Sequence, residues 1–422
     1  MTSRRSPLKP LDEALAELLG FAVCLDGIES VFTFEADGRV LAQDLVAALQ
    51  VPAQDNSAMD GYAVRCADVV QMMRESSSGL AELQVSQRIA AGSSGTALAP
   101  VSAARIFTGA PIPLGADAVV MQEDCEVLAS DIASLTSAVR IKAVPTPGQW
   151  IRHAGQDVRR GAVILSKGDR LRPAALGLAA SIGMNFLPVA RRPRVALFST
   201  GDELVLPGEV PPEQMKPGAI YNSNRFFLRA LLLRLGCQVS DLGIVPDRLD
   251  ATMQALRVAA LNHDLILTSG GVSVGEEDHI KPAVQSLGSL DLWQIAIKPG
   301  KPFAYGRVQN THFIGLPGNP VSSFITFLLL VRPFLLKLQG ATDLTSRAIA
   351  VPAHFNWPQA DQRREFLRVK RNADAGLDLF ANQSSGVLTS AVWGDGLVDN
   401  PPGQTIAFGD VVQFIPFLEL MG

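Results

Sequence analysis

The sequence predicts a multidomain fold of the α/β plus β class, with a central doubly wound α/β domain between two regions rich in short strands. Three observations predict this class. The chain has 422 residues, and chains beyond about 250–300 residues divide into domains because a single core stops growing. Strand-like and helix-like segments alternate between residues 183 and 340, as in parallel sheets covered by helices. On both sides of this region, glycine and proline turns separate short apolar runs.

The N-terminal module is predicted to occupy residues 1–182 and to consist of two lobes. Its helical and β linker part begins with a helix at residues 10–20, where apolar residues have helical spacing and Gly20 ends the pattern. A β-rich lobe is expected to be inserted at about residues 55–145, because glycines recur there between short apolar runs, as in small β-barrels and sheets.

The central domain is predicted at residues 183–340, with strands at 195–198, 239–245 and 264–268. Helices are expected at 224–235, 249–262 and 278–287, and Pro320 is expected to begin a long helix that ends at Leu338. Alternating strands and helices imply a parallel sheet, whose ligands bind outside the carboxyl ends of the strands. Residues 341–422 return to short strands with proline and glycine turns, so this C-terminal part is predicted to be a small β-barrel.

Composition and charge exclude several classes of protein. With 18% charged residues and a net charge of -4, the chain has no basic bias, so nucleic acid is not expected as its main partner. The densest apolar stretch, residues 324–331, is far shorter than the ~20 residues of a membrane span, so no membrane association is expected. The start of the chain has no apolar signal segment. The 4 cysteines have no CxxC or zinc spacing, which predicts a reduced, cytoplasmic protein.

The most informative segment runs from residue 265 to 281, where a buried-type strand leads into a glycine-rich turn. Glycines and hydroxyls in this turn allow backbone N–H groups to point at an oxyanion. The turn contains Thr268, Ser269, Gly270, Gly271, Ser273 and Gly275. The carboxylates that follow, Glu276, Glu277 and Asp278, would repel a phosphate unless a hard cation such as Mg²⁺ bridged them to it. An N-capped helix start with a solvated acidic first turn is the alternative.

Polar residues also follow the other predicted strands. Asp202 and Glu203 come after the first strand and Asp247 after the second. Two lysines, Lys298 and Lys301, lie in a further loop, which is expected to follow a fourth strand. If the sheet is parallel, these loops converge on one pocket, and both ammoniums can address one oxyanion. Helix capping by the acidic residues and a hairpin with surface lysines are the alternatives.

Two segments of the N-terminal module also carry unusual chemistry, DNSAMDGYA at residues 55–63 and RIFTGAPIPLGAD at residues 105–117. They include Asp60 and Thr108. Small residues beside carboxylates suit the close approach of a ligand or metal, and tight-turn chemistry is the alternative. Serine-hydrolase and zinc-protease motifs, the P-loop and the Rossmann fingerprint are missing from the sequence, which disfavours those classes.

Six runs of residues resemble, in the same order, the molybdopterin molybdenumtransferases, the family that includes the E domain of gephyrin. They are DNSAMDGYA (55–63), IFTGAP (106–111), STGDEL (199–204), SGGVSVG (269–275), IKPGKP (297–302) and GLPGNPVS (315–322). The resemblance extends from about residue 10 to the C-terminus. It implies a central molybdopterin-binding domain of the MogA type, and a homodimer in which the Asp60 and Thr108 loops of one subunit face that domain of the other. The implied reaction converts adenylylated molybdopterin and molybdate into molybdenum cofactor and AMP, with Mg²⁺.

The resemblance also implies roles for individual residues. The implied catalytic residues are Asp60, Thr108, Glu203, Asp247, Ser273 and Asp278, of which Asp278 and Glu203 would also hold Mg²⁺. Those implied to bind adenylylated molybdopterin are Thr200, Ser269, Gly270, Gly271, Gly275, Pro317 and Asn319. Those implied to receive molybdate are Lys298, Lys301, Pro302, Arg368 and Ser385.

Two other functions stay open at the level of sequence. The central domain also resembles the enzymes that adenylylate molybdopterin in the preceding step, although that smaller family resembles this domain alone. A scaffold or binding role is the second alternative, since gephyrin is also a scaffold. Beyond its substrates, the expected partners of the chain are the molybdopterin adenylyltransferase and molybdoenzyme maturation factors.

Overall fold

The computed structural model of the protein describes residues 8–128, 137–272 and 279–421, without the side chains of Leu292 and Trp293. The chain forms two compact units. The large unit consists of Met1–Gln43, Lys167–Pro173 and Phe186–Gly422, and the small unit of Asp44–Ser166 and Ala174–Asn185. The predicted central and C-terminal domains therefore belong to one unit, together with the start of the chain. Their predicted boundaries at residues 182 and 340 stay a prediction.

In the small unit, the described residues include a six-stranded sheet of order β7-β4-β6-β5-β9-β8. Its strands are β4 (Gly61–Val64), β5 (Ala81–Ile89), β6 (Ser102–Ile106), β7 (Ala118–Met121), β8 (Cys125–Leu128) and β9 (Ala138–Ile141). Alternation in β5 places Ala81 and Leu83 in the core and Glu82 in solvent. Helix α2 (Cys66–Glu75) packs against this strand. The other elements are the strand pairs β2 (Leu45–Val46) with β11 (Val163–Leu165) and β3 (Asn56–Ser57) with β10 (Ile151–Arg152), and helix α3 (Pro173–Ser181).

The large unit begins with helix α1 (Leu11–Phe21), which confirms the predicted helix. Leu11, Ala14 and Leu18 recur at helical spacing and are buried. Strand β1 (Ile28–Phe32) then pairs antiparallel with β12 (Phe186–Ala190). These elements bring the start of the chain into the same unit as the α/β domain.

The α/β domain is built on a sheet of order β16-β13-β17-β21-β20-β18. Its strands are β13 (Arg194–Thr200), β16 (Gln238–Val245), β17 (Leu265–Ser269), β18 (Gly288–Gln294), β20 (Pro302–Val308) and β21 (Thr311–Leu316). The first four in the order are parallel, but β20 is antiparallel to both β21 and β18. The prediction of a wholly parallel sheet was therefore wrong at this edge. Strand β18 is antiparallel to β20, and β20 is antiparallel to β21, so β18 runs in the same direction as the four parallel strands. The segment after β18 therefore still reaches the carboxyl edge of the sheet.

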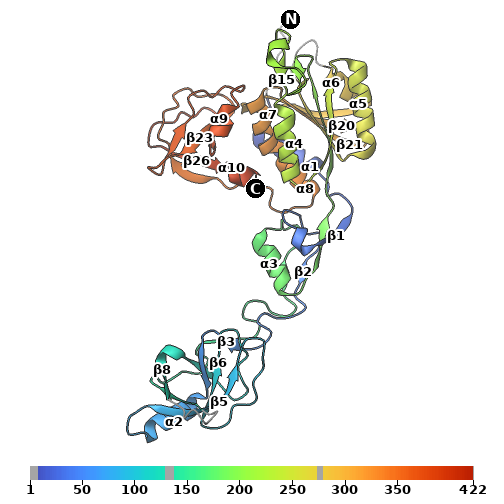
Figure 1. The fold of residues 1–422 in the computed structure, drawn as a ribbon. Coiled ribbons are helices and arrows are strands. Elements are labelled where there is room, and N and C mark those ends of the chain that lie inside the picture. Colours follow the sequence, from blue (N-terminus) through green and yellow to red (C-terminus); the bar gives the residue numbers. More distant parts are fainter. Residues whose placement is uncertain (1–7, 129–136, 273–278, 422) are drawn as a thin grey trace. The chain divides into compact units, whose positions relative to one another are not determined.

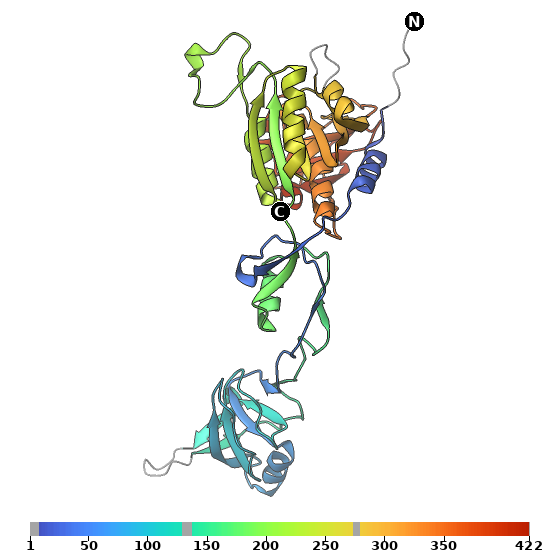
Figure 2. The same ribbon diagram turned by 90° about the vertical axis from the view of Figure 1, so that its right-hand side faces the viewer.

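Helices cover both faces of this sheet, as predicted for a doubly wound domain (Figure 1). Successive strand residues point to opposite faces. Leu197 and Leu267 pack with α4 (Asn224–Arg234), α7 (Pro320–Thr326) and α8 (Arg332–Leu338). Ala196 and Ile266 pack with α5 (Leu249–Asn262) and α6 (Ile280–Leu287). Figure 2 shows α5, in yellow, in front of the strands. The short parallel pair β14 (Leu204–Val205) and β15 (Ile220–Tyr221) precedes α4.

The predicted long helix from Pro320 to Leu338 is confirmed, with a π-helical turn at Phe327–Val331 between α7 and α8. The helix has 19 residues and its most apolar window has a mean hydropathy of 1.8, so by length and composition it could cross a membrane. However, 83% of its apolar window is buried inside the protein. Such burial is that of a core helix, and the central core of the large unit includes Phe327, Leu330 and Phe334.

The C-terminal part forms the predicted small β-barrel. Its strands are β22 (Ile349–Pro352), β23 (Arg364–Arg371), β24 (Leu377–Leu379), β25 (Gly396–Asn400) and β26 (Val411–Pro416), in the order β23-β25-β26-β22, with β24 also paired to β23. A backbone bridge between Ala353 and Leu377 joins the end of β22 to β24 and closes the ring. Strand β19 (Ile297–Lys298) from the α/β domain adds to β23 in parallel. Helices α9 (Thr389–Trp393) and α10 (Phe417–Met421) complete the barrel domain.

Candidate functional site

A polar cleft of about 570 Å³ opens at the carboxyl edge of the central sheet. It is bordered by the ends of β13, β17 and β21, by the start of α4 and α7, and by Gly386 of the barrel. The predicted site residues that line it are Thr200, Glu203, Asp247, Ser269, Gly270, Gly271, Pro302, Pro317 and Asn319. Residues predicted from five separate loops thus lie around one cavity, as the rule for open α/β sheets leads one to expect.

The floor of the cleft depends on glycines that let two strand ends approach each other. Gly271 has a φ of 63°, and a Cβ on it would lie 2.6 Å from Thr200 Oγ1. Gly270 has a φ of 96°, and a Cβ on it would lie 2.4 Å from the carbonyl oxygen of Thr200. Any side chain at either position would therefore push β13 away from β17.

Two buried polar groups at the cleft have no hydrogen-bond partner within the described chain. Thr200 is 3% exposed and its Oγ1 is unpaired; Asn222 is 2% exposed and its Nδ2 is unpaired. The amide orientation of Asn222 is fixed, because its Oδ1 accepts a hydrogen bond from the backbone N–H of Arg225 at 3.2 Å. Leaving such groups unpaired costs roughly 1–3 kcal/mol each, so their position at a cleft favours a ligand that completes them.

Neighbouring polar groups are held in place by the protein itself. Asn224 Nδ2 donates to Ser269 Oγ and to the carbonyl oxygen of Gly318, both at 2.7 Å. This pair of bonds ties the start of α4 to the loops after β17 and β21. Asn222 and Asn224 were not predicted as site residues. The Asn-Ser-Asn run directly before a helix was the available signal, because side chains at a helix start reach the strand-end loops.

The carboxylates of the cleft fit a Mg²⁺ ion of the kind that bridges protein and phosphate oxygens. Glu203 and Asp247 both line the cleft, and Mg²⁺ in such sites uses only one or two carboxylates together with substrate oxygens and waters. Across residues 8–128, 137–272 and 279–421, no group of three or more potential metal ligands is found. The predicted residues Ser273, Gly275 and Asp278 lie outside the described residues.

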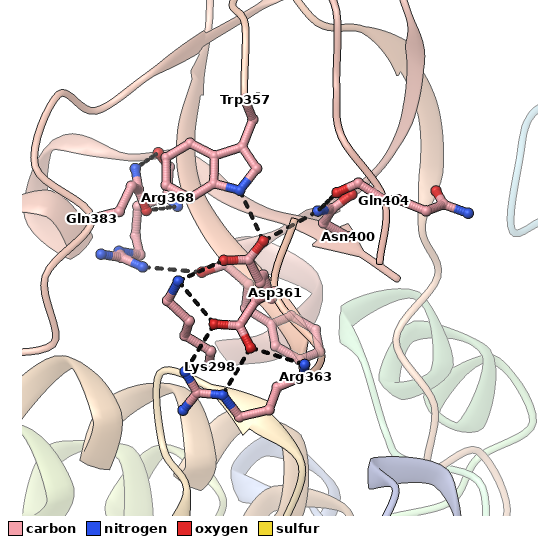
Figure 3. Close-up of polar contacts among 10 residues, drawn as sticks. Lys298, Trp357, Asp361, Arg363, Arg368, Gln383, Asn400 and Gln404 are labelled. Atoms are coloured by element: carbon pink, nitrogen blue, oxygen red, sulfur yellow. Dashed lines mark hydrogen bonds and ion pairs between the residues drawn. The ribbon is translucent and has the colours of Figure 1, made fainter. Parts of the chain in front are cut away.

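Lys298 lies in an ion-pair network between the α/β domain and the barrel (Figure 3). Its ammonium is 2.9 Å from Glu365 Oε1 and 3.2 Å from Asp361 Oδ2. Burial lowers the pKa of Lys298, but hydrogen bonds to the two carboxylates outweigh it and raise the pKa overall. Trp357 Nε1–H donates to Glu365 Oε2 at 2.8 Å, and Asn400 Nδ2–H donates to the same oxygen at 3.4 Å. Sequence reasoning missed Glu365, which lies 67 residues beyond Lys298.

Arg368 is buried without a carboxylate partner among the described residues, at 1% exposure. Its guanidinium donates to Ser390 Oγ at 3.1 Å and to the carbonyl oxygens of Phe366 and Ser384 at 3.1 and 3.3 Å. Burial lowers the pKa of Arg368 to about 10. A buried cation with neutral neighbours favours an anionic ligand, because isolated buried charge is costly.

Two further residues predicted for molybdate, Lys301 and Ser385, differ from Arg368. The Lys301 ammonium is half-buried and forms no ion pair or hydrogen bond with the described part of the chain. Ser385 meets the central domain through its backbone, where its carbonyl oxygen accepts a hydrogen bond from Val321 N–H at 2.9 Å. Four of the residues predicted for molybdate do not line the cleft itself, namely Lys298, Lys301, Arg368 and Ser385. Their role in molybdate binding stays a prediction.

Asp60 and Thr108 lie together in the small unit. Thr108 donates to Asp60 Oδ1 from its backbone N–H at 2.7 Å and from its hydroxyl at 2.8 Å. These bonds, the backbone one first, lower the pKa of Asp60. The carboxylate is thus kept ionised and fixed on an exposed loop. That these residues complete the site of the large unit stays a prediction.

Family models match three successive parts of the chain. Residues 9–183 match the MoeA N-terminal region (domain I and II), residues 196–337 the probable molybdopterin binding domain, and residues 350–417 the MoeA C-terminal region (domain IV). These three matches follow the order that the sequence predicts for the N-terminal module, the α/β domain and the barrel.

Related proteins extend the match over the whole chain. The molybdopterin molybdenumtransferase of Haemophilus influenzae is 37% identical over 424 residues, which covers 98% of this chain and 99% of that protein. The molybdopterin molybdenumtransferase of a Nostoc species is 34% identical over 387 residues, covering 89% of this chain and 86% of that protein. Among solved structures, the molybdopterin biosynthesis moeA protein of Pyrococcus horikoshii is similar at a TM-score of 0.83 and 29% identity, covering 97% of this chain and 100% of that one.

Proposed function

The chain belongs to the molybdopterin molybdenumtransferase family, and from this membership we propose that it transfers molybdenum from molybdate to adenylylated molybdopterin, releases AMP and uses Mg²⁺. The observation that carries the proposal is the strand-edge cleft. It combines two carboxylates, a barrel loop and buried donors that have no partner within residues 8–128, 137–272 and 279–421. The chain is accordingly an enzyme of molybdenum cofactor biosynthesis.

The residues of the cleft divide the work of binding. Thr200 Oγ1 and Asn222 Nδ2 supply hydrogen-bonding groups that have no partner among the residues that the structure describes. The glycines after β17 bring backbone N–H groups close to the adenylyl phosphate. Glu203 and Asp247 would hold Mg²⁺, which reduces the phosphate charge that opposes attack at phosphorus. In this step a water oxygen would form a bond to the adenylyl phosphorus, and the bond from that phosphorus to the pterin phosphate oxygen would break. The pterin keeps its own phosphate as the leaving group, and AMP carries the new oxygen.

The oxyanion is assigned to the side of the site formed by the barrel. Arg368 offers a buried guanidinium without a carboxylate partner in the described chain, and Lys301 offers an ammonium that is likewise unpaired there. A dianion gains from two such cations, because hydrogen bonds between charged groups are about twice as strong as neutral ones. We assign molybdate to these groups, with Pro302 and Ser385 beside them.

We also propose a homodimeric assembly and a cytoplasmic location for the enzyme. A homodimer would place Asp60 and Thr108 of one subunit at the cleft of the other, in line with the fixed carboxylate on the exposed Thr108 loop. The adenylyltransferase is the expected source of the substrate. A cytoplasmic location is supported by Cys24, Cys66, Cys125 and Cys237, which are all free thiols.

Glu203→Gln tests the proposed reaction. The substitution keeps the shape of the side chain and removes its charge. Single-turnover AMP release should therefore fall by about a hundredfold, as for loss of one preorganised electrostatic group. The rate should recover in part at high Mg²⁺. Glu209→Gln is the matched control, because Glu209 is exposed in the same region and does not line the cleft. AMP release at the wild-type rate by Glu203→Gln at all Mg²⁺ concentrations would contradict the role of the cleft.

A further inference from the structure

The network around Lys298 is balanced in charge by the protein itself. Two carboxylates, Glu365 and Asp361, face two cations, Lys298 and Arg363. Arg363 binds Asp361 through Nε at 3.0 Å and Nη2 at 2.9 Å. A dianion that approaches Lys298 therefore meets a cluster with no net charge, and it must compete with two carboxylates already in contact with the ammonium.

Glu365 is the fixed member of this network. It is 1% exposed and accepts hydrogen bonds from Trp357 and Asn400 on its Oε2, while its Oε1 contacts Lys298. Its backbone is the direct neighbour of Lys298 where β19 pairs with β23. By contrast, the Lys298 side chain is 40% exposed. The lysine can therefore turn away from the pair, whereas the carboxylate is held where it is.

Arg368 provides the contrast on the same strand. Both Glu365 and Arg368 lie on β23 and are 1% exposed. The guanidinium of Arg368 has neutral acceptors only within the described residues, so no carboxylate there neutralises its charge. Of the predicted cations, Lys301 is also unpaired in that part of the chain, and Lys298 alone has its charge neutralised by carboxylates.

We propose that Glu365 is a positioning residue that sets the affinity of the enzyme for molybdate, by competing with the oxyanion for the ammonium of Lys298. The inference rests on the proposed function and deepens it. In the resting protein Lys298 belongs to the ion pair, and Arg368 and Lys301 carry most of the binding. Weak competition of this kind suits an enzyme that must release a molybdenum group after receiving it, because an oxyanion held by three free cations would dissociate slowly.

The proposal is tested by measuring the affinity of the full-length protein for molybdate, without turnover, by isothermal titration. Glu365→Gln keeps an acceptor for Trp357 and removes the competing charge, so it should tighten molybdate binding by about fivefold, the upper range for one partly exposed ion pair. Adding Lys298→Met to Glu365→Gln should remove this gain. Asp399→Asn is the matched control, since Asp399 pairs with Arg364 in the same barrel and should leave molybdate binding unchanged.

A second test compares substitutions of the two lysines and does not require the Glu365→Gln protein to fold. In the wild-type background Lys298→Met should weaken molybdate by less than about twofold, whereas Lys301→Gln should weaken it by about tenfold or more. Equal losses in these two variants would overturn the inference, as would unchanged or weaker binding by a folded Glu365→Gln protein. If neither the wild type nor any variant bound molybdate, the proposed function would fail, and this inference with it.

Discussion

The strand-edge cleft and the Lys298 network differ in how they satisfy their buried polar groups. In the cleft, Thr200 Oγ1 and Asn222 Nδ2 are buried without partners in the described chain. In the network, both oxygens of Glu365 and the ammonium of Lys298 have partners from the protein. Unpaired buried groups cost stability unless a ligand completes them. The cleft therefore keeps buried groups for a ligand to complete, whereas the network is already satisfied by side chains from two domains of one unit.

Arg368 and Arg364 give the sharpest test of this difference, because they lie on the same strand. Arg364 pairs with Asp399 through Nε and Nη2 at 2.6 and 2.5 Å, and Arg368 has no carboxylate partner in the described residues. Arg368→Met should raise the molybdate concentration for half-maximal turnover by about tenfold to a hundredfold, as for loss of a hydrogen bond to a charged group. Arg364→Met should instead lower the unfolding temperature and leave that concentration unchanged. A molybdate defect of equal size in both variants would erase the distinction.

A substitution of Thr200 tests the cleft, because it should make the protein more stable. Thr200→Val replaces a buried hydroxyl, which has no partner in the described part of the chain, by a methyl group. The free energy of unfolding should therefore rise by up to about 1 kcal/mol, while the substrate binds several-fold more weakly. Thr326→Val is the control, since Thr326 Oγ1 donates to the carbonyl oxygen of Ser322 at 2.7 Å and is buried. That variant should lose stability. Urea unfolding of both proteins checks the signs, and a destabilised Thr200→Val would mean that the hydroxyl is structural.

The smallest expected effect concerns acid stability of the network. Hydrogen bonds from Arg363, ahead of those from Lys298, hold the pKa of Asp361 well below its ordinary value of 3.8. A depressed carboxyl pKa contributes stability above the unfolded pKa, and this contribution is lost as pH falls through the folded pKa. Asp361→Asn should therefore destabilise the protein by about 1 kcal/mol at pH 7, with the difference shrinking below about pH 4. Equal differences in urea midpoint at pH 7 and pH 3 would contradict this linkage.

The elements that sequence predicted best have strong local signals. Helix α5 has the predicted bounds, Leu249–Asn262, because its apolar spacing is regular and a turn precedes it. Strand β17 was likewise predicted to within a residue, since it is a short apolar run before glycines. The direction of β20 was missed, because the pairing of β18, β20 and β21 depends on hairpins rather than on the apolar pattern of each strand.

The site could be predicted in outline from the rule that loops after parallel strands converge. Thr200, Asp247 and Gly271 come from three such loops and line one cleft. What the sequence could not provide was the pairing of each charge. Lys298 and Lys301 lie in the same short motif and look equivalent in the sequence. In the structure, however, Lys298 pairs with Glu365, a carboxylate on another domain, and the pairing of β19 with β23 brings Lys298 and Glu365 together. Long-range pairing of this kind has no local signal.

The most direct measurement is a crystal structure of the protein with AMP, Mg²⁺ and molybdate. We expect AMP in the strand-edge cleft, with its phosphate beside Gly270 and Gly271. Acceptor atoms of AMP should receive hydrogen bonds from Thr200 Oγ1 and Asn222 Nδ2. We expect molybdate on Arg368, with the ion pair between Lys298 and Glu365 still formed in part of the molecules. AMP bound away from the cleft, or molybdate bound with Arg368 uninvolved, would contradict the central claim.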